Sequence, residues 1–543
     1  MQKLRENMPF AVVAIIFMAT LSLVTLASVR ANDGRLVYTL DDPYIHMAIA
    51  KNVATHGVFG VTRLEFSSCT SSPLWTVLLA VSYTLFGVSD WLPGVWATLF
   101  ALAALYATDA LARRLGAGLW GRLFAGLSVV YFAPLVPIIS TGMEHTMHVF
   151  FGITLVGASV SFTLDPKSKR LAPVCIAGFL AVAARYESLF LVAPLALLLV
   201  FMKQWRGAVR LFVTAMLPVI VYGVFSLSHG AYFLPNSLMM KGNFPDISGF
   251  RSLIMALGGR GFVRLTADSN RHLMMIGILL LLGAARSLRR VPLSFLHLSL
   301  VGAIWLHLQF AATGWFYRYE AYLVAISLPF IVVLHFEALS QLGALLLTRQ
   351  KVLHRIALWG CALLFLCPLL RRARVSMGEV VPASNHIYRQ QFHMADFVRT
   401  MYPSGVRIAL NDLGAVTYYA DVDVLDLWGL GTVEVTRAKR SGNYNSAVIE
   451  EFLTDHETDV VIVYPHWFQG TQSLPKSAVW VANWVMRDHY HGKTVSFYSM
   501  SQKGARDLEE RLRRYEDRLP TSVEVDYEIT EQGTEGDAVK RAP

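Results

Sequence analysis

Two adjacent carboxylates, Asp41 and Asp42, follow the first apolar segment of the chain closely enough to lie near a bilayer surface. Pro43 favours the first position of a helix, so we expect Asp42 to be the N-cap of a helix over residues 43–56. Asp41 has no part in such a helix. Because a neighbouring like charge and partial desolvation raise the proton affinity of a carboxylate, Asp41 is the expected general base, able to accept a proton from an attacking hydroxyl group.

Four further stretches combine ionisable residues in a way that could bind a charged substrate: "TGMEHTMH", "RYE", "LPNSLMMKGN" and "WFYRYE". Their candidate residues are Glu144, His145, Arg185, Glu187, Lys241 and Arg318. Each stretch has an ordinary alternative: an interfacial polar turn for the Glu-His pair, an ion pair within "RYE", a solvated loop lysine, and an arginine that snorkels within an aromatic belt. The ion pair is the favoured interpretation of "RYE", and both readings of the other stretches stay open.

The chain that must position these residues is strongly apolar. Of its 543 residues, 54 % are hydrophobic and 16 % are charged, and the mean hydropathy is +0.45. Long apolar runs recur from Pro9 to about Leu370, which indicates a polytopic α-helical membrane protein with about eleven transmembrane helices. The net charge of +10 does not indicate a nucleic acid partner, because most Lys and Arg lie in short connections, where they determine topology.

The composition becomes charged near residue 375. We therefore expect a transmembrane catalytic domain over residues 1–374, a soluble α/β domain over 375–520 and a disordered acidic tail over 521–543. "VRIALNDLGAVTYY" predicts a strand, a turn and a helix, "DVDVLDLWG" and "TDVVIVY" predict further strands, and "QKGARDLEERLRRYEDRL" predicts an amphipathic helix. Asp412 and Asp426 follow predicted strands, where we expect them to form turns rather than to bind an acceptor.

The basic clusters also orient the chain. If they face the cytoplasm, the polar stretches and the C-terminal domain lie outside. Residues 171–202 then form a hairpin with "RYE" at its outer tip, and Ser71–Gly87 forms an interfacial or re-entrant helix. Polar residues gathered at one edge favour an enzyme at the outer leaflet over a transporter, which needs ionisable residues near the midplane. A lipid-linked-sugar flippase and a glycan-binding membrane scaffold are the alternatives.

The segment "LDDPYIHMAIAKNVATHGVFG", followed by "SSPLWTVLLA", resembles the first outer loop of GT-C glycosyltransferases. It is most similar to the cell-wall terminal arabinofuranosyltransferase group, which uses a polyprenyl-phosphate sugar donor. "TGMEH", "RYE" and "LPNSLMMK" resemble later outer-face stretches of that group, and "NDLGAVTYYADVDVLDLWGLG" resembles a stretch of its C-terminal domain. The resemblance covers most of residues 1–431. Pro43, and "RYE" in place of an Arg-Pro-Glu-like stretch, differ from the group.

The resemblance implies transfer of a sugar, arabinofuranose or another pentose, to a glycan, lipid or protein acceptor. The reaction is expected on the extracytoplasmic side of the cell membrane. A carboxylate of the pair Asp41 and Asp42 would act as base, and Lys241 and Arg318 would bind the donor phosphate. No cofactor is implied beyond the lipid-linked sugar as co-substrate. The four cysteines have no metal-ligand spacing, and the need for a divalent metal stays open.

Overall fold

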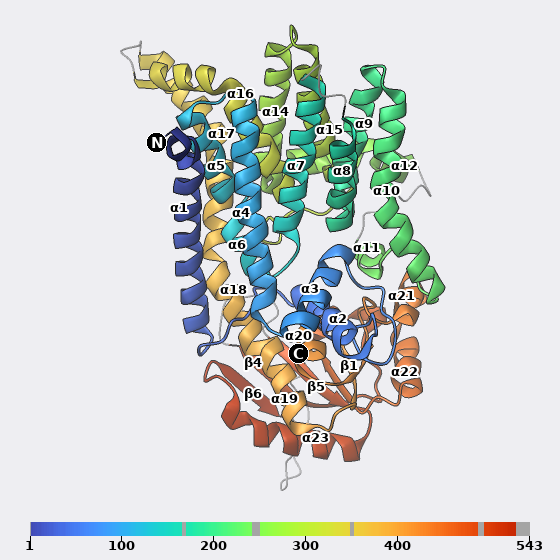
Figure 1. Ribbon diagram of the computed structural model, residues 1–543. Helices are drawn as coiled ribbons and strands as arrows, with labels where there is room; N and C mark the ends of the chain where they lie inside the picture. The colour runs from blue at the N-terminus through green and yellow to red at the C-terminus, as the bar shows by residue number, and fades with distance from the viewer. Residues whose placement is uncertain (1, 165–169, 242–249, 348–351, 487–493, 528–543) are drawn as a thin grey trace. The chain divides into compact units, whose positions relative to one another are not determined.

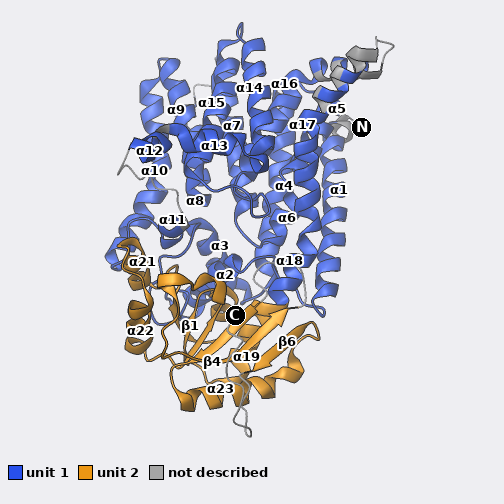
Figure 2. Ribbon diagram, turned by 180° about the vertical axis from the view of Figure 1, so that it is seen from behind, with its two compact units in different colours: residues 1–388 blue, residues 389–543 orange. Residues whose placement is uncertain are grey.

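The computed structural model describes residues 2–164, 170–241, 250–347, 352–486 and 494–527. It divides into two compact units, residues 1–388 and residues 389–543 (Figures 1 and 2). The first unit is helical, and the second is built on a six-stranded sheet. This is the predicted combination of a helical membrane domain with a small α/β domain.

The helices of the first unit are α1 (Gln2–Ala31), α2 (Asp42–His56), α3 (Pro73–Phe86), α4 (Trp91–Arg114), α5 (Leu119–Phe132), α6 (Leu135–Ser140), α7 (His145–Leu164), α8 (Ala172–Ala184), α9 (Leu189–Phe201), α10 (Trp205–Ser228), α11 (Asn236–Lys241), α12 (Phe250–Ile254), α13 (Arg260–Thr266), α14 (Arg271–Arg286), α15 (Val291–Phe310), α16 (Ala321–Leu347), α17 (Val352–Gly378) and α18 (Val380–Ile387). Short 3₁₀ or π turns cover Tyr186–Ser188, Met255–Gly259 and Asp268–Asn270.

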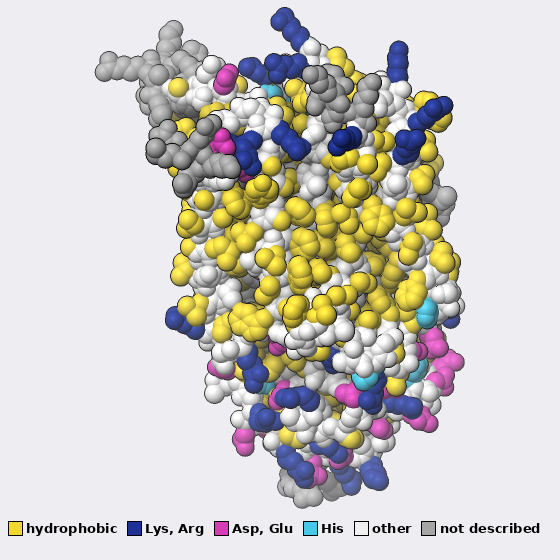
Figure 3. All heavy atoms as spheres, in the orientation of Figure 1, with side chains coloured by type: hydrophobic (Ala, Val, Ile, Leu, Met, Phe, Trp, Pro, Cys, Tyr) yellow, Lys and Arg dark blue, Asp and Glu magenta, His cyan; other side chains and the backbone are white. Residues whose placement is uncertain are grey.

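Six helices of the described residues are long and apolar enough to cross a bilayer: they lie in α1, α4, α7, α10, α15 and α16. Three shorter apolar helices, α5, α8 and the one over Tyr186–Phe201, bring the helical unit closer to the expected number, whereas α3 is the segment expected to be interfacial or re-entrant. Figure 3 shows a broad band of hydrophobic side chains on this unit, with Lys and Arg gathered at one end of the band. The chain is therefore a multi-pass membrane protein.

Prolines and glycines set the ends of the two helices that follow the first span. Pro43 and Pro73 occupy the first turns of α2 and α3, and the Ser72 hydroxyl accepts a hydrogen bond from the Trp75 amide at 3.3 Å. Gly57 ends α2 with a φ of 70°, a left-handed conformation that costs glycine little. In Figure 1, α2 and α3 pack together beside the end of the bundle where α4 begins, as an interfacial segment would.

The second unit contains α19 (His393–Met401), β1 (Arg407–Leu410), α20 (Gly414–Tyr419), β2 (Asp423–Asp426), α21 (Val433–Arg440), α22 (Ser446–Asp455), β3 (Val460–Val463), β4 (Val479–Met486), β5 (Thr494–Ser499), α23 (Gln502–Tyr515) and β6 (Val523–Tyr527). The sheet order is β2-β1-β3-β5-β4-β6. Strands β2, β1 and β3 are parallel, and the remaining pairs are antiparallel. The strands predicted at β1, β2 and β3 and the helices predicted at α20 and α23 are confirmed.

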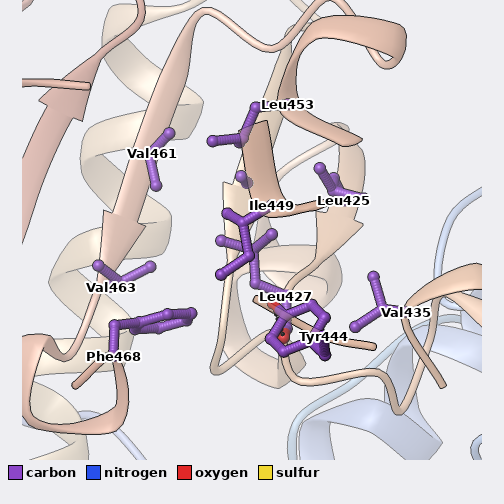
Figure 4. Packing of buried hydrophobic residues seen from close by; sticks show 10 residues of the cluster. Leu425, Leu427, Val435, Tyr444, Ile449, Leu453, Val461, Val463 and Phe468 are labelled. Atoms are coloured by element: carbon purple, nitrogen blue, oxygen red, sulfur yellow. Dashed lines mark hydrogen bonds between the residues drawn. The ribbon is translucent and has the colours of Figure 1, made fainter. Parts of the chain in front are cut away.

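One core of this unit packs α21 and α22 against the parallel part of the sheet (Figure 4). Its members include Leu425, Leu427, Ile449, Val461 and Phe468, all buried. Every side chain of β3 is buried, which explains why "VVIV" is a continuous apolar run rather than an alternating one. This core fixes the carboxyl ends of β1, β2 and β3 beside one another.

The predicted disordered tail begins too early. Residues Val523–Tyr527, which we assigned to the tail, form the edge strand β6 and pair antiparallel with β4 from Ala482 to Met486. The alternation of Val523, Val525 and Tyr527 suits an edge strand, and an acidic average composition obscured that short pattern. Residues 528–543 lie outside the described residues.

Candidate functional site

The acidic pair lies at the start of α2, and this helix begins one residue earlier than predicted. Asp41 is the N-cap, its backbone is helical (φ −78°, ψ −30°), and its side chain makes no capping hydrogen bond. Asp42 is the first helical residue, and its carboxylate accepts a 2.6 Å charged hydrogen bond from Nη2 of Arg318. The prediction that Asp42 caps the helix is therefore wrong. A charged partner from another element outcompetes the backbone amides for its carboxylate.

Arg318 is the buried cation of this site. It is 3 % exposed, and Nη2 also donates to the Tyr319 hydroxyl at 2.9 Å. Its Nε and Nη1 are buried without a hydrogen-bond partner among the described residues. Since an unpaired buried donor is costly, these N–H groups are positioned to bind an anion that the chain itself does not supply. Tyr319 and Asp42 offset the effect of burial, so the pKa of Arg318 is raised and its charge is secure.

A left-handed turn immediately before Arg318 determines where its side chain begins. Trp315, Phe316 and Tyr317 have φ values of 47°, 63° and 56°, and Gly314 has 92°. Left-handed backbone costs a residue with a Cβ roughly 1–2 kcal/mol, so three consecutive residues of this kind need support from outside the turn.

That support is a buried ion pair which sequence reasoning missed. Glu320 Oε2 accepts from the Gly314 amide at 3.1 Å, and Arg372 Nη2 donates to the Tyr317 carbonyl at 2.8 Å. Arg372 Nη1 and Glu320 Oε1 are 2.6 Å apart, and both side chains are 0 % exposed. Burial raises the pKa of Glu320, but the Arg372 guanidinium and the neighbouring His272 outweigh this and lower it to about 2. The pair thus holds the turn at both ends.

A second buried network joins two of the predicted stretches. Arg185 donates to Glu144, which is 0 % exposed, and also to both oxygens of Glu187 at 2.5 and 3.1 Å. The predicted ion pair within "RYE" is confirmed, and it includes Glu144 as well. Burial raises the pKa of Glu187, but the Arg185 guanidinium lowers it to about 2, so this carboxylate remains ionised beside the arginine.

Tyr319 connects the two networks. Its ring lies 4.8 Å from the Arg318 guanidinium carbon and 5.6 Å from that of Arg185, and the His145 ring meets it edge-on at 6.0 Å. His145 is 1 % exposed, and neither ring nitrogen has a hydrogen-bond partner among the described residues. His145 therefore brings a second unsatisfied polar group close to the one on Arg318. The aromatic-belt interpretation hid this role of Tyr319.

Helix α2 also contributes to the site, through His46. Its Nδ1 lies 2.9 Å from the Thr76 hydroxyl on α3, and its Nε2 lies 3.7 Å from Oε2 of Glu144. Ser71 lies between them, 3.4 Å from His46 Nε2 and 3.4 Å from Glu144 Oε1. The "SSPLW" segment therefore contacts the carboxylate of "TGMEH", although about seventy residues separate them in sequence.

The structure thus brings seven of the eight candidate residues into one network or its immediate neighbourhood: Asp41, Asp42, Glu144, His145, Arg185, Glu187 and Arg318. Lys241 ends α11, and its side chain lies outside the described residues. The segment "LPNSLMMKGN", which contains Lys241, is held near its start by Asn236. The backbone N–H of Asn236 donates to the Ser68 carbonyl at 2.6 Å. Among the described residues, no group of three or more His, Cys, Asp or Glu side chains could hold a metal ion.

An apolar cavity of about 460 Å³ opens between α5 and α16. Its walls are aromatic and aliphatic side chains with two serines: Phe124, Leu127, Ser128, Tyr131, Phe132, Val332, Phe336 and Ser340. The cavity reaches Phe132, whose carbonyl accepts from Arg372 Nε at 2.7 Å. One end of this apolar space is therefore linked through Arg372 to the turn that carries Arg318.

Comparison with known proteins assigns the fold. The chain is similar to the crystal structure of ArnT from Cupriavidus metallidurans bound to undecaprenyl phosphate, with a TM-score of 0.51, 13 % identity and coverage of 90 % of this chain and 98 % of that one. It also matches arabinofuranosyltransferase AftD from Mycobacteria, at a TM-score of 0.41 and 12 % identity, over 89 % of this chain and 41 % of AftD.

Sequence comparison adds one local match. A domain of unknown function (DUF8728) matches residues 385–498. No curated protein matches the sequence. The architecture, a helical membrane unit followed by a small α/β unit, is that of the GT-C fold.

Proposed function

We propose that this protein is a GT-C-type membrane glycosyltransferase. It moves a sugar from a polyprenyl-phosphate donor to a glycan, glycolipid or protein acceptor. The observation that carries the proposal is Arg318, a buried and permanently charged side chain with unpartnered Nε and Nη1 groups, beside the carboxylate of Asp42. A phosphate that leaves a sugar needs such a cation, and an attacking hydroxyl needs such a base.

The reaction forms one carbon–oxygen bond, breaks another, and transfers one proton. The acceptor hydroxyl oxygen attacks the anomeric carbon, the bond from that carbon to the phosphate oxygen breaks, and polyprenyl phosphate departs with the electron pair. The hydroxyl proton passes to a carboxylate. Arg318 stabilises the negative charge that grows on the leaving phosphate. His145, whose ring lies 6.0 Å from that of Tyr319, is proposed as a further partner of the same group.

We assign the base to Asp42 rather than to Asp41, which the sequence favoured. The Asp42 side chain is 26 % exposed, whereas Asp41 is 7 % exposed. A base must reach the acceptor, so the accessible carboxylate is the better candidate. The ion pair with Arg318 would also hold the base and the phosphate site in a fixed relation to each other.

The proposal also includes a binding place for the isoprenoid chain of the donor and the side of the membrane on which transfer occurs. The apolar cavity between α5 and α16 suits an isoprenoid chain, because burying each CH₂ group contributes about 0.8 kcal/mol. The cluster of Lys and Arg at one end of the hydrophobic band supports a cytoplasmic position for that end (Figure 3). Catalysis would then take place on the extracytoplasmic side of the cell membrane. Lys241 remains the proposed second phosphate partner, and a pentose such as arabinofuranose remains the proposed sugar.

Binding and transfer can be measured separately on the full chain in lipid nanodiscs. Undecaprenyl phosphate should bind more tightly than undecaprenol, which has the same tail and no phosphate. Loss of one charged hydrogen-bonding group costs about 1.5–3 kcal/mol, so Arg318→Gln should weaken undecaprenyl phosphate binding about 10- to 100-fold. Arg271→Gln, which alters an exposed arginine paired with Asp268, is the matched control and should leave binding unchanged.

Transfer is tested with a panel of polyprenyl-phosphate pentoses and hexoses. Asp42→Asn should retain donor binding and lower the transfer rate about 10²–10⁴-fold, while Asp41→Asn should lower it less. Equal donor binding by wild type and Arg318→Gln would reject the phosphate site. Movement of the intact lipid-linked sugar across the membrane without any transfer would replace the proposal with a flippase.

A further inference from the structure

The carboxyl ends of the three parallel strands in the second unit bring together residues that the proposed reaction does not use. The chain passes from β1 to β2 on one side and then to β3 on the other side of β1. The switch in direction therefore lies between β1 and β3, the edge at which open parallel sheets bind their ligands. Asn411 and Asp412 follow β1, and Tyr464 and Trp467 follow β3.

Two buried side-chain amides at this edge have only half of their hydrogen bonds. Asn411 is 2 % exposed, and its Oδ1 accepts from the Tyr464 backbone amide at 3.0 Å. Gln391 is 5 % exposed, and its Nε2 donates to Asp412 Oδ2 at 2.9 Å and to the Tyr464 hydroxyl at 2.7 Å. Asn411 Nδ2 and Gln391 Oε1 have no partner among the described residues.

The partners fix which atom of each amide is unsatisfied. A backbone N–H can only donate, so the Asn411 atom that faces it must be the oxygen. An ionised carboxylate can only accept, so the Gln391 atom that faces Asp412 must be the nitrogen. What remains is the NH₂ group of Asn411, with two N–H donors, and the carbonyl oxygen of Gln391, on two side chains that both bond to Tyr464. Leaving such groups buried and unpaired costs about 1–3 kcal/mol each.

Asp426, a further polar residue at this edge, has a purely structural role. Asp426, at the end of β2, is 1 % exposed, and its carboxylate accepts from the amides of Trp428, Leu430 and Gly431 at 2.8, 2.5 and 2.7 Å. It closes a turn and has no need of a ligand. The predicted turn role of Asp426 is thereby confirmed, and the half-satisfied amides stand out against it.

Aromatic rings border the same edge. The half-buried rings of Trp428 and Trp467 lie 4.6 Å apart, and the Tyr464 ring lies 6.2 Å from Trp467. His466 adds an exposed imidazole 5.9 Å from Tyr464. Flat apolar surfaces beside a few fixed polar groups form the usual lining of a site for a small polar molecule.

We infer that the second unit carries a saccharide-binding site at the carboxyl ends of β1 and β3, formed by Gln391, Asn411, Asp412 and the rings of Trp428 and Trp467. A sugar hydroxyl both accepts and donates, so it satisfies Asn411 Nδ2 and Gln391 Oε1, and the C–H face of a sugar ring packs on an indole. The Asp412 carboxylate accepts from a further hydroxyl and disfavours an anionic ligand such as a phosphate. The assignment of this saccharide as the acceptor rests on the proposed function, whereas binding itself does not.

The test is saccharide binding to the full chain in nanodiscs without any donor. The probes are soluble oligosaccharides of arabinofuranose, xylose, mannose, glucose and galactose, detected by saturation-transfer NMR and titrated by calorimetry. Asn411→Asp keeps the oxygen that accepts from Tyr464 and removes the unsatisfied donor. It should weaken binding about 10- to 100-fold. Asn445→Asp is the matched control, because Asn445 is an exposed helix N-cap and aspartate caps equally well.

Separate readouts distinguish this site from the proposed reaction. Asn411→Asp should leave undecaprenyl phosphate binding unchanged, and the exposed-site variant Arg271→Gln should leave saccharide binding unchanged. Trp467→Ala, accepted only if its thermal unfolding matches that of the wild type, should also weaken saccharide binding. The inference is overturned if none of the oligosaccharides binds the wild type, or if the Asn411→Asp and Asn445→Asp variants bind with the affinity of the wild type.

Discussion

Arg372→Met tests whether a buried ion pair holds the left-handed turn that precedes Arg318. The substitution leaves Glu320 as an unpaired charge with 0 % exposure, and breaking such a pair from one side costs about 3–5 kcal/mol. It also removes the donors to the carbonyls of Phe132 and Tyr317, at 2.7 and 2.8 Å. We therefore expect a clear fall in Tm for the helical unit, measured by thermal unfolding in detergent.

The same substitution should also weaken binding at the proposed phosphate site of Arg318. Without Arg372 the left-handed residues from Trp315 to Tyr317 lose their contact with α17, and Arg318 loses its fixed starting point. Undecaprenyl phosphate should bind about 10-fold more weakly, because the turn that carries Arg318 is displaced. A substitution that weakens binding at Arg318 by displacing its backbone identifies Arg372 as a positioning residue.

A double-mutant cycle separates this account from a general loss of packing. Arg372→Met with Glu320→Gln removes both charges, so the double variant should be more stable than the sum of the single effects by about 0.5–3 kcal/mol. Arg371→Met is the control, because Arg371 is the exposed neighbour and should change stability by less than about 0.5 kcal/mol. Additive single effects, or an Arg372→Met variant as stable as the wild type, would refute the reasoning.

Three further outcomes are expected. The pKa of Glu320 is lowered from 4.5 to about 2, so its stabilising contribution is complete above pH 4.5 and is lost as the pH falls toward 2; acid unfolding curves of wild type and Glu320→Gln should converge over that range. Arg185→Leu leaves two buried carboxylates without a counter-charge and should destabilise the helical unit by about 3–5 kcal/mol in the same thermal assay, with Arg185→Lys recovering only part of it. Gly142→Ala should be more harmful than Gly116→Ala in expression and Tm, because both glycines have positive φ but only at Gly142 would a Cβ meet the Tyr38 ring, at 2.6 Å.

The local sequence determined the features that depend on neighbouring residues. Long apolar runs specified the membrane helices, and short apolar stretches bounded by turn residues specified β1, β2 and β3, because both patterns are properties of a short segment. The Arg185–Glu187 pair could be foreseen for the same reason, since its members are two residues apart. The candidate polar stretches could also be selected, because ionisable residues beside a membrane span need a structural or functional reason.

Only the tertiary structure decided how those residues are paired. Arg318 meets Asp42 across 276 residues, Arg372 meets Glu320 across 52, and Arg185 reaches Glu144 across 41. Local rules predicted a helix cap for Asp42, but they contain no term for a buried guanidinium that a distant turn brings beside it. In a buried site of low dielectric, ion pairs form between side chains that are close in space, whatever their separation in sequence. The strained turn before Arg318 persists because the Arg372–Glu320 pair holds it.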